Sequence, residues 1–165
     1  MSEMTELFSR LTLGVYVVGV AHGERRDAFT AAWVMQVSYD PLLLAVSVNP
    51  DNASHAILQA SGGFAVSVLK QGQLELARHF GTRSGRGQDK LAGIAWRPGR
   101  EGAPVLQEAL AYFECELVNR MQAGDHEISV GRVIGGQILD RDATPMNYAE
   151  TGPMDGSSTL YPASF

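Results

Sequence analysis

The feature that most constrains the fold is a two-residue alternation near the middle of the chain. In the segment AYFECEL, apolar residues from Ala111 to Leu117 alternate with Tyr112, Glu114 and Glu116. Successive side chains of a strand point to opposite faces, so this pattern predicts a half-exposed strand. After the turn QAGDH, residues 128–139 are predicted to be its antiparallel partner, and their three glycines indicate bulges or bends.

Other short apolar runs are closed by turn residues. They predict strands over 14–22, 28–38, 42–49 and 64–69, the first two forming a hairpin. Helices are expected over 4–12, from Asn52 or Ser54 to about Ala60, and over 71–81. Strands and helices do not alternate regularly. We therefore predict a single domain spanning 1–165 and a mainly β fold, a closed antiparallel barrel of six or more strands with peripheral helices.

Residues 82–104 are rich in Gly, Arg and polar residues and are too long for an ordinary connection. Loops of this kind usually carry function or are disordered. The segment after Asp140 contains several Pro and Gly residues, so little regular structure is expected there.

Charge and cysteine content exclude several classes of function. The chain has 13 Lys and Arg against 18 Asp and Glu, a formal net charge of −5, so we expect no nucleic-acid partner. Cys115 is the only cysteine and no metal-ligand spacing occurs, so no disulfide and no metal site are expected. The N-terminal segment carries acids where a signal peptide would carry bases, and no run approaches a membrane span. We expect a cytoplasmic location and no membrane contact.

Two segments near strand ends carry residues that could line a ligand-binding pocket. In 27–36, small residues would let a ligand approach the backbone, and hydroxyl and amide groups are close by, although an ordinary half-buried strand explains the same pattern. In 49–55, between a strand and a helix, helix N–H groups could bind phosphate. Plain capping by Asn52 or Ser54 explains the same residues, and the spacing alone favours it.

Two further segments carry ionisable groups. Residues 82–90 are the densest basic stretch in an acidic chain, and their length favours anion binding over a solvated loop. In the turn 124–127, His126 lies between Asp125 and Glu127. Flanking carboxylates tune a histidine near neutral pH, which suits a proton donor or a hydrogen-bond partner of a polar substrate. A hairpin loop facing water is the alternative.

Taken together, these segments resemble the flavin reductase-like family of FMN-binding split barrels, over a match from about Phe8 to Tyr161. The resemblance lies in motifs that occur in the family's order: GVYVV (14–18), TAAWVMQVS (30–38), DP (40–41), NASH (52–55), FAVSVL (64–69), LARHFG (76–81), the SGR and DK pairs of the 84–90 loop, GDH (124–126) and VGRV (130–133).

The resemblance implies the roles of individual residues. The flavin ring would lie on the backbone of residues 30–33, with the Gln36 amide stabilising charge on the ring. His126, steadied by Asp125, would orient the nicotinamide. Relatives often carry a base where this chain has Asp51, which shifts the expected phosphate contacts to the 82–90 loop. The implied cofactor-binding residues are Thr30, Ala31, Ala32, Trp33, Gln36, Asn49, Asn52, Ser54, His55, Arg83, Arg86 and Lys90.

The implied activity is hydride transfer from NAD(P)H to flavin, with FMN, or alternatively FAD, as cofactor. Members of the family are usually homodimers with flavin at the subunit interface, and a monooxygenase or redox protein is a further expected partner. The alternative is a non-enzymatic FMN electron carrier. No Rossmann fingerprint follows a strand, so the nicotinamide would have to bind over the flavin.

Overall fold

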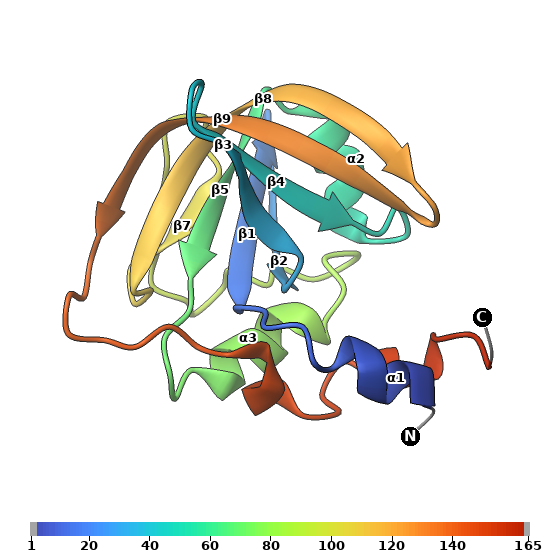
Figure 1. Cartoon of the computed structure of the whole chain (residues 1–165). Coiled ribbons are helices and arrows are strands. Elements are labelled where there is room, and N and C mark those ends of the chain that lie inside the picture. Colours follow the sequence, from blue (N-terminus) through green and yellow to red (C-terminus); the bar gives the residue numbers. More distant parts are fainter. Residues whose placement is uncertain (1–2, 164–165) are drawn as a thin grey trace.

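The structure is a computed structural model that describes residues 3–163. Figure 1 shows a curled sheet with helices at its periphery. The helices are α1 (Glu3–Phe8), α2 (Ala53–Ala60), α3 (Leu74–Gly81) and the 3-10 helices η1 (Tyr148–Thr151) and η2 (Ser157–Thr159). The strands are β1 (Tyr16–His22), β2 (Arg25–Ala31), β3 (Val34–Ser38), β4 (Leu43–Val48), β5 (Gly63–Val68), β6 (Trp96–Pro98), β7 (Pro104–Leu106), β8 (Ala111–Ala123) and β9 (His126–Ile138).

One antiparallel sheet dominates the fold. Its strand order is β2-β1-β5-β8-β9-β4-β3, and β6 and β7 form a separate small hairpin. The two edge strands, β2 and β3, are joined only by Ala32 and Trp33, so the sheet must curl until its edges meet (Figure 1). Within residues 3–163, no hydrogen-bonded ladder joins β2 to β3. The mainly β, antiparallel prediction is confirmed, with a barrel that is open along one seam.

Strand β1 is buried on both faces, which explains why its sequence is almost continuously apolar. Val18 and Val20 belong to a cluster that includes Leu58 of α2. Val17 points the other way and joins a second cluster with Phe80 of α3. Burying each such side chain stabilises the fold by ~1.5–3 kcal/mol. The two clusters fix α2 and α3 against the β1-β2 hairpin.

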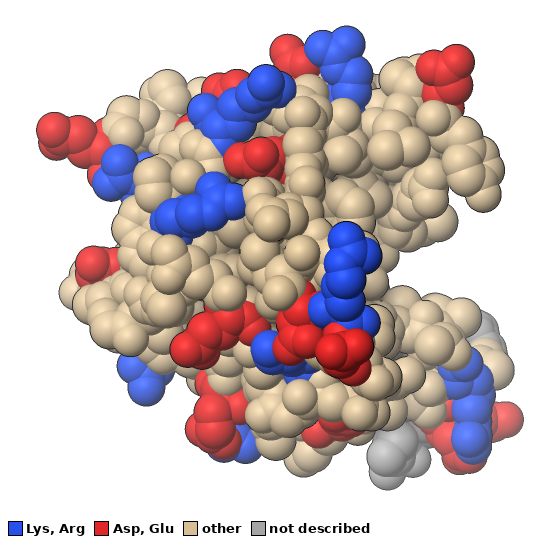
Figure 2. Space-filling view, turned by 90° about the vertical axis from the view of Figure 1, so that its left-hand side faces the viewer, with Lys and Arg blue, Asp and Glu red and all other residues tan. Residues whose placement is uncertain are grey.

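The first helix and the C-terminal segment form a lobe beside the barrel. Phe8 of α1 lies against Tyr161, with ring centroids 5.4 Å apart. The backbone N–H of Tyr148 donates to the carbonyl of Leu13 at 2.8 Å. Figure 2 shows a hollow, on its right-hand side, between the upper body of the molecule and the lower lobe, and basic and acidic side chains interspersed over the face in view.

Several predicted elements need correction. The run 28–38 is two strands, not one: β2 pairs with β1, whereas β3 pairs with β4. The first helix ends at Phe8, not at residue 12. The segment 82–104 is not wholly irregular, because β6 lies within it and pairs with β7. The β1-β2 hairpin and the antiparallel pairing of β8 with β9 are confirmed.

Candidate functional site

The junction between β2 and β3 lies at one end of the barrel. The backbone N–H of Ser47, near the end of β4, donates to the Trp33 carbonyl at 3.0 Å. The Thr30 hydroxyl donates a hydrogen bond to the Ala77 carbonyl of α3 at 2.7 Å, and this bond links β2 to α3. Ala31 is buried and Ala32 is half-buried. The junction is therefore held from two sides while part of it stays accessible.

Trp33 and the β8-β9 turn come together at this end. The rings of Trp33 and His126 lie 4.9 Å apart and are tilted by 54°. Trp33 is half exposed, so the ring pair forms part of the surface. Gln36 is also exposed, and its amide makes only a long 3.3 Å contact to the Ser38 carbonyl. The side-chain amide is thus available for a further partner.

His126 is held in one orientation by its neighbour. Its Nδ1 lies 2.8 Å from Asp125 Oδ1, and this hydrogen bond lowers the pKa of the Asp125 carboxyl. A carboxylate only accepts hydrogen bonds, so Nδ1 carries the proton that it donates to Asp125, and Nε2 of the neutral ring is left as an acceptor. The ring can therefore accept a hydrogen bond at Nε2 from an amide such as a carboxamide.

The polar turn before α2 is built largely for structure. Asn49 Oδ1 accepts the Asp51 N–H at 2.9 Å, and Asn52 Oδ1 accepts the Ser54 N–H at 2.9 Å as the cap of α2. These contacts match the capping alternative. Asn49 is nevertheless exposed and Asn52 half-buried, so both residues remain accessible at the surface of the turn.

Buried polar groups lie beneath this turn. His55 Nε2 is 3.3 Å from Glu127 Oε1, and both side chains are largely buried. Among residues 3–163, Ser129 Oγ is buried without a hydrogen-bond partner, and His55 Nε2 and Glu127 Oε1 are buried with only each other nearby. Such atoms call for ordered water or a polar ligand. The barrel end next to His126 is therefore chemically suited to a polar group.

The 82–90 loop divides into an exposed half and a buried end. Arg83 and Arg86 are exposed, and the Arg86 guanidinium donates to the Asp51 carbonyl at 3.1 Å. Lys90, in contrast, has a side chain only 2% exposed, with its ammonium 3.4 Å from Asp27 Oδ1. Burial lowers the pKa of Lys90, and the Asp27 charge opposes that shift. The Lys90 ammonium is therefore enclosed and already paired with Asp27, unlike the exposed arginines of the same loop.

Asp27 is the residue that sequence reasoning missed. It is buried at the start of β2 and accepts hydrogen bonds from the Ser54 hydroxyl (2.7 Å) and the Ala28 N–H (2.8 Å) in addition to its ion pair with Lys90. Gly85 lies so close that a Cβ there would meet Asp27 Oδ2 at 2.2 Å. Asp27 thus joins β2, α2 and the 82–90 loop.

A groove of about 500 Å³ lies where these three elements meet. This volume is within the range of small-molecule sites. The residues lining it are Glu24, Arg25, Arg26, Asp27, Pro50, Asn52, Ala53, Ala56, Ile57, Gly85, Arg86, Gln88 and Asp89. The groove therefore combines apolar side chains from α2 with charged groups from the β1-β2 hairpin and the loop.

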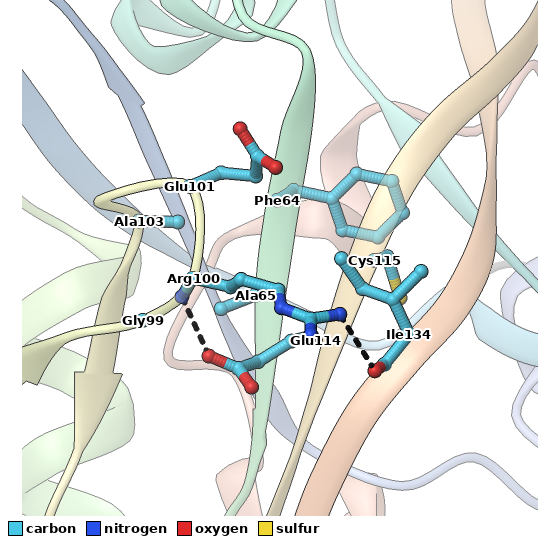
Figure 3. Close-up of a pocket in the computed structure, with 9 residues that line it drawn as sticks. All are labelled: Phe64, Ala65, Gly99, Arg100, Glu101, Ala103, Glu114, Cys115 and Ile134. Carbon is cyan, nitrogen blue, oxygen red and sulfur yellow. Dashed lines mark hydrogen bonds between the residues drawn. The ribbon is translucent and has the colours of Figure 1, made fainter.

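A second hollow is far too small for a cofactor. It holds about 10 Å³, room for about one water molecule, and Figure 3 shows the residues around it. The Arg100 N–H donates to Glu114 Oε1 at 2.7 Å, and the Arg100 guanidinium donates to the Ile134 carbonyl at 3.3 Å. These bonds tie the segment before β7 to β8 and β9, so this hollow is structural.

The donor set of the larger site fits a flavin nucleotide. Exposed Arg25 and Arg86 and the N-terminus of α2 in this groove suit a phosphate. The accessible β2-β3 junction, which does not line the groove, suits a flat ring. In the described part of the chain, no group of three or more His, Cys, Asp or Glu side chains could hold a metal ion. No helix within residues 3–163 is long and apolar enough to cross a membrane.

The fold and the site define an antiparallel barrel domain with a groove lined by charged and apolar side chains and a hydrogen-bonded histidine at the barrel end. Residues 8–157 match the model of the flavin reductase like domain. The chain therefore belongs to the flavin reductase-like family, a family of flavoprotein oxidoreductases.

Known proteins resemble the chain over most of its length. "Putative diflavin flavoprotein A 3" of Nostoc sp. is 34% identical over 92% of this chain, which spans only about a quarter (27%) of that relative. The NADH:FAD oxidoreductase SgcE6 of Streptomyces globisporus has a TM-score of 0.82 and 34% identity, covering 88% of this chain and 86% of its own, and it has also been solved with NAD and FAD fragments. BorF, the flavin reductase component of a bacterial two-component tryptophan halogenase, has a TM-score of 0.76 and 35% identity, covering 87% and 96%.

Proposed function

We propose that this chain is a flavin reductase that transfers hydride from NAD(P)H to FMN or FAD. The observation that carries the proposal is the placement of His126, hydrogen-bonded to Asp125 and packed against the tilted Trp33 ring, beside the accessible β2-β3 junction. Family membership and the resemblance to SgcE6 and BorF support it.

The junction residues would hold the flavin ring. The backbone of Thr30, Ala31, Ala32 and Trp33 offers N–H groups, the two alanines add little side-chain bulk, and the Gln36 amide can donate to an oxygen or nitrogen of the ring. The bound flavin would supply the hydride acceptor. Donors placed where negative charge develops stabilise the reduced form without reorganising.

His126 would orient the hydride donor. With Nδ1–H held by Asp125, Nε2 can accept a hydrogen bond from the nicotinamide carboxamide. Alignment of the two reacting atoms is the main service a protein provides in hydride transfer. Asp125 acts through His126, as a positioning residue.

The phosphate would bind between the turn before α2 and the exposed half of the loop. Asn49, Asn52 and the N-terminus of α2 approach from one side, and Arg83 and Arg86 from the other. Ser54 and Lys90 lie behind, bound to Asp27. We assign them the role of holding these walls together, and His55 a position beneath them.

We further propose that the whole chain, 1–165, is one domain and forms a homodimer. Edge strand β3 is short and largely exposed, and Met35 and Val37 are 64% and 46% exposed. Neighbouring Tyr39 and Leu42 are also exposed. An unpaired edge with apolar side chains is a surface that proteins usually cover.

Met35→Glu is expected to shift the molecular mass in light scattering from dimer to monomer, and a dimer that persists would contradict this interface.

A cytoplasmic location and an electron-accepting partner complete the proposal. Cys115 is a free, buried cysteine, in keeping with a reducing compartment. BorF is the reductase component of a two-component enzyme, and we propose that a monooxygenase or a redox protein accepts the reducing equivalents made here.

The second candidate is a non-enzymatic FMN carrier, which the resemblance to a diflavin flavoprotein keeps open. Steady-state oxidation of NADH and NADPH with excess free FMN or FAD separates the two. A reductase shows nicotinamide oxidation that rises with free flavin. Slow oxidation that free flavin does not accelerate would favour the carrier.

A further inference from the structure

An ionisable pair lies inside one end of the barrel, among apolar side chains. Glu127 of β9 pairs across the sheet with Val48 of β4, and residues directly opposite each other in a sheet point to the same face. Val48 belongs to the buried core cluster that includes Leu58 of α2. Glu127 therefore points into the barrel, where His55 of α2 meets it. His55 Nε2 lies 3.3 Å from Glu127 Oε1, and the two side chains are 10% and 14% exposed.

This pair is better suited to fixing a position than to adding stability. Burying two ionisable groups has a desolvation cost that their attraction only about offsets, so apolar side chains would stabilise the same place as well. Ser129, two residues further along the same face of β9, is also fully buried, and its hydroxyl has no hydrogen-bond partner among residues 3–163. What His55 and Glu127 do provide is the one ion pair between α2 and β9 in the described part of the chain.

The start of β9 has few other contacts that fix it. The pairing of β4 with β9 ends at Glu127, and His126, one residue earlier, pairs only with Ala123 across the β8-β9 turn. The ends of strand ladders open most easily. Neighbouring side chains of a strand point to opposite faces. Glu127 held inside the barrel therefore keeps His126 on the outer face, where its ring packs against Trp33.

We propose that His55 and Glu127 are positioning residues for His126. The His55 ring holds the Glu127 carboxylate, the pair fixes the first residues of β9 against α2, and His126 is thereby kept where it can align a hydride donor. This role rests on the proposed function and deepens it. Neither residue of the pair acts on the flavin or the donor directly, because both act through His126.

Three variants separate the contact from the fold. Glu127→Leu removes the polar contact, whereas Glu127→Gln keeps an oxygen that can accept a hydrogen bond from His55. Glu116→Leu is the matched control, because it removes an exposed glutamate that pairs with Arg132 on the same β8-β9 hairpin. The conservative variant and the control are expected to behave as the wild-type protein in both measurements below.

The first measurement needs neither flavin nor donor. The Trp33 and His126 rings lie 4.9 Å apart, so their protons should give nuclear Overhauser effects in the NMR spectrum of the flavin-free protein. These signals are expected in the wild-type protein, in Glu127→Gln and in Glu116→Leu. They should be lost in Glu127→Leu, because the start of β9 is then no longer fixed to α2.

The second measurement is stopped-flow reduction of the FMN-loaded protein by NADH and NADPH. Glu127→Leu should slow flavin reduction by about 10-fold through misalignment of the donor, while the Kd for FMN stays unchanged. The same substitution is then made in the His126→Ala background. There it should cause no further slowing, because two residues that act through one interaction are not additive.

Several results would overturn the positioning role. An intact ring contact or a wild-type rate in Glu127→Leu would do so, and so would an equal slowing with and without His126, which would indicate a general effect on the fold. If Glu127→Leu fails to fold, the double variant His55→Leu with Glu127→Leu replaces it in both measurements, since apolar pairs are tolerated in interiors. A wild-type protein that reduces no flavin with either donor removes the proposed function, whereas the NMR measurement still shows whether the pair fixes His126.

Discussion

Replacing Lys90 by Met tests the role assigned to the buried ion pair. The Lys90 and Asp27 side chains are 2% and 6% exposed, and their charged atoms lie 3.4 Å apart. Methionine removes the ammonium but keeps most of the volume. Asp27 then stays buried with only the Ser54 hydroxyl and the Ala28 N–H as partners.

The expected loss follows from leaving a charge unpaired in the interior. Removing one partner of a buried ion pair costs about 3–5 kcal/mol. Because Asp27 keeps two hydrogen bonds, we expect the lower end, about 3 kcal/mol. For a domain of this size, 1 kcal/mol lowers Tm by about 2–4 °C, so Lys90→Met should unfold about 6–12 °C below the wild-type protein.

Calorimetry or urea unfolding measures this loss, and the chain offers a matched control. Lys70 and Asp140 form an ion pair at 2.8 Å, but their side chains are 29% and 38% exposed. Lys70→Met should cost at most ~1 kcal/mol. The double variant Asp27→Asn with Lys90→Met should recover part of the loss, since no charge is then stranded. A Lys90→Met protein no less stable than Lys70→Met would refute the reasoning.

Three further outcomes are expected. Burial and the Glu114 charge raise the pKa of Cys115 to about 12, so the native thiol should resist a disulfide reagent at pH 8 and react once the protein is unfolded; rapid labelling of the native protein would contradict this. The contribution of this thiol to the free energy of unfolding should fall as the pH rises above the ordinary thiol pKa of about 8.5. Asn52→Ala should cost about 1 kcal/mol in urea unfolding through loss of the α2 cap, and an unchanged midpoint would rule the cap out. His126→Ala should leave FMN affinity intact but slow flavin reduction by NAD(P)H about 10- to 100-fold in stopped flow, ~1.4–2.7 kcal/mol; an unchanged rate would leave His126 as a turn residue.

Local patterns predicted much of the sheet. The alternation from Ala111 identified β8 and its pairing with β9, yet β8 continues to Ala123. Residues 118–122 are exposed, so no apolar periodicity marks them. No sequence pattern marks the break between β2 and β3 at Ala32 and Trp33 either. It is set by pairing with different strands rather than by a turn residue.

The sequence predicted which segments form the site, but not which of their side chains are exposed and which are buried. The GDH turn and the 30–33 junction do meet, through the Trp33 and His126 rings. Lys90 and Arg86 belong to one basic stretch, and nothing local distinguishes the buried lysine from the exposed arginine. The difference comes from Asp27, which is 63 residues earlier and reaches Lys90 only in the folded chain. Long-range ion pairs of this kind leave no periodic signal.

The most direct test of the central claim is anaerobic mixing of the flavin-loaded protein with NADH and with NADPH while the flavin absorbance is followed. If the protein is a reductase, the absorbance band of its oxidised flavin should disappear after mixing with at least one donor. The rate of this reduction should exceed that of free flavin under the same conditions. A band that persists with both donors, while dithionite still bleaches it, would contradict hydride transfer at this site.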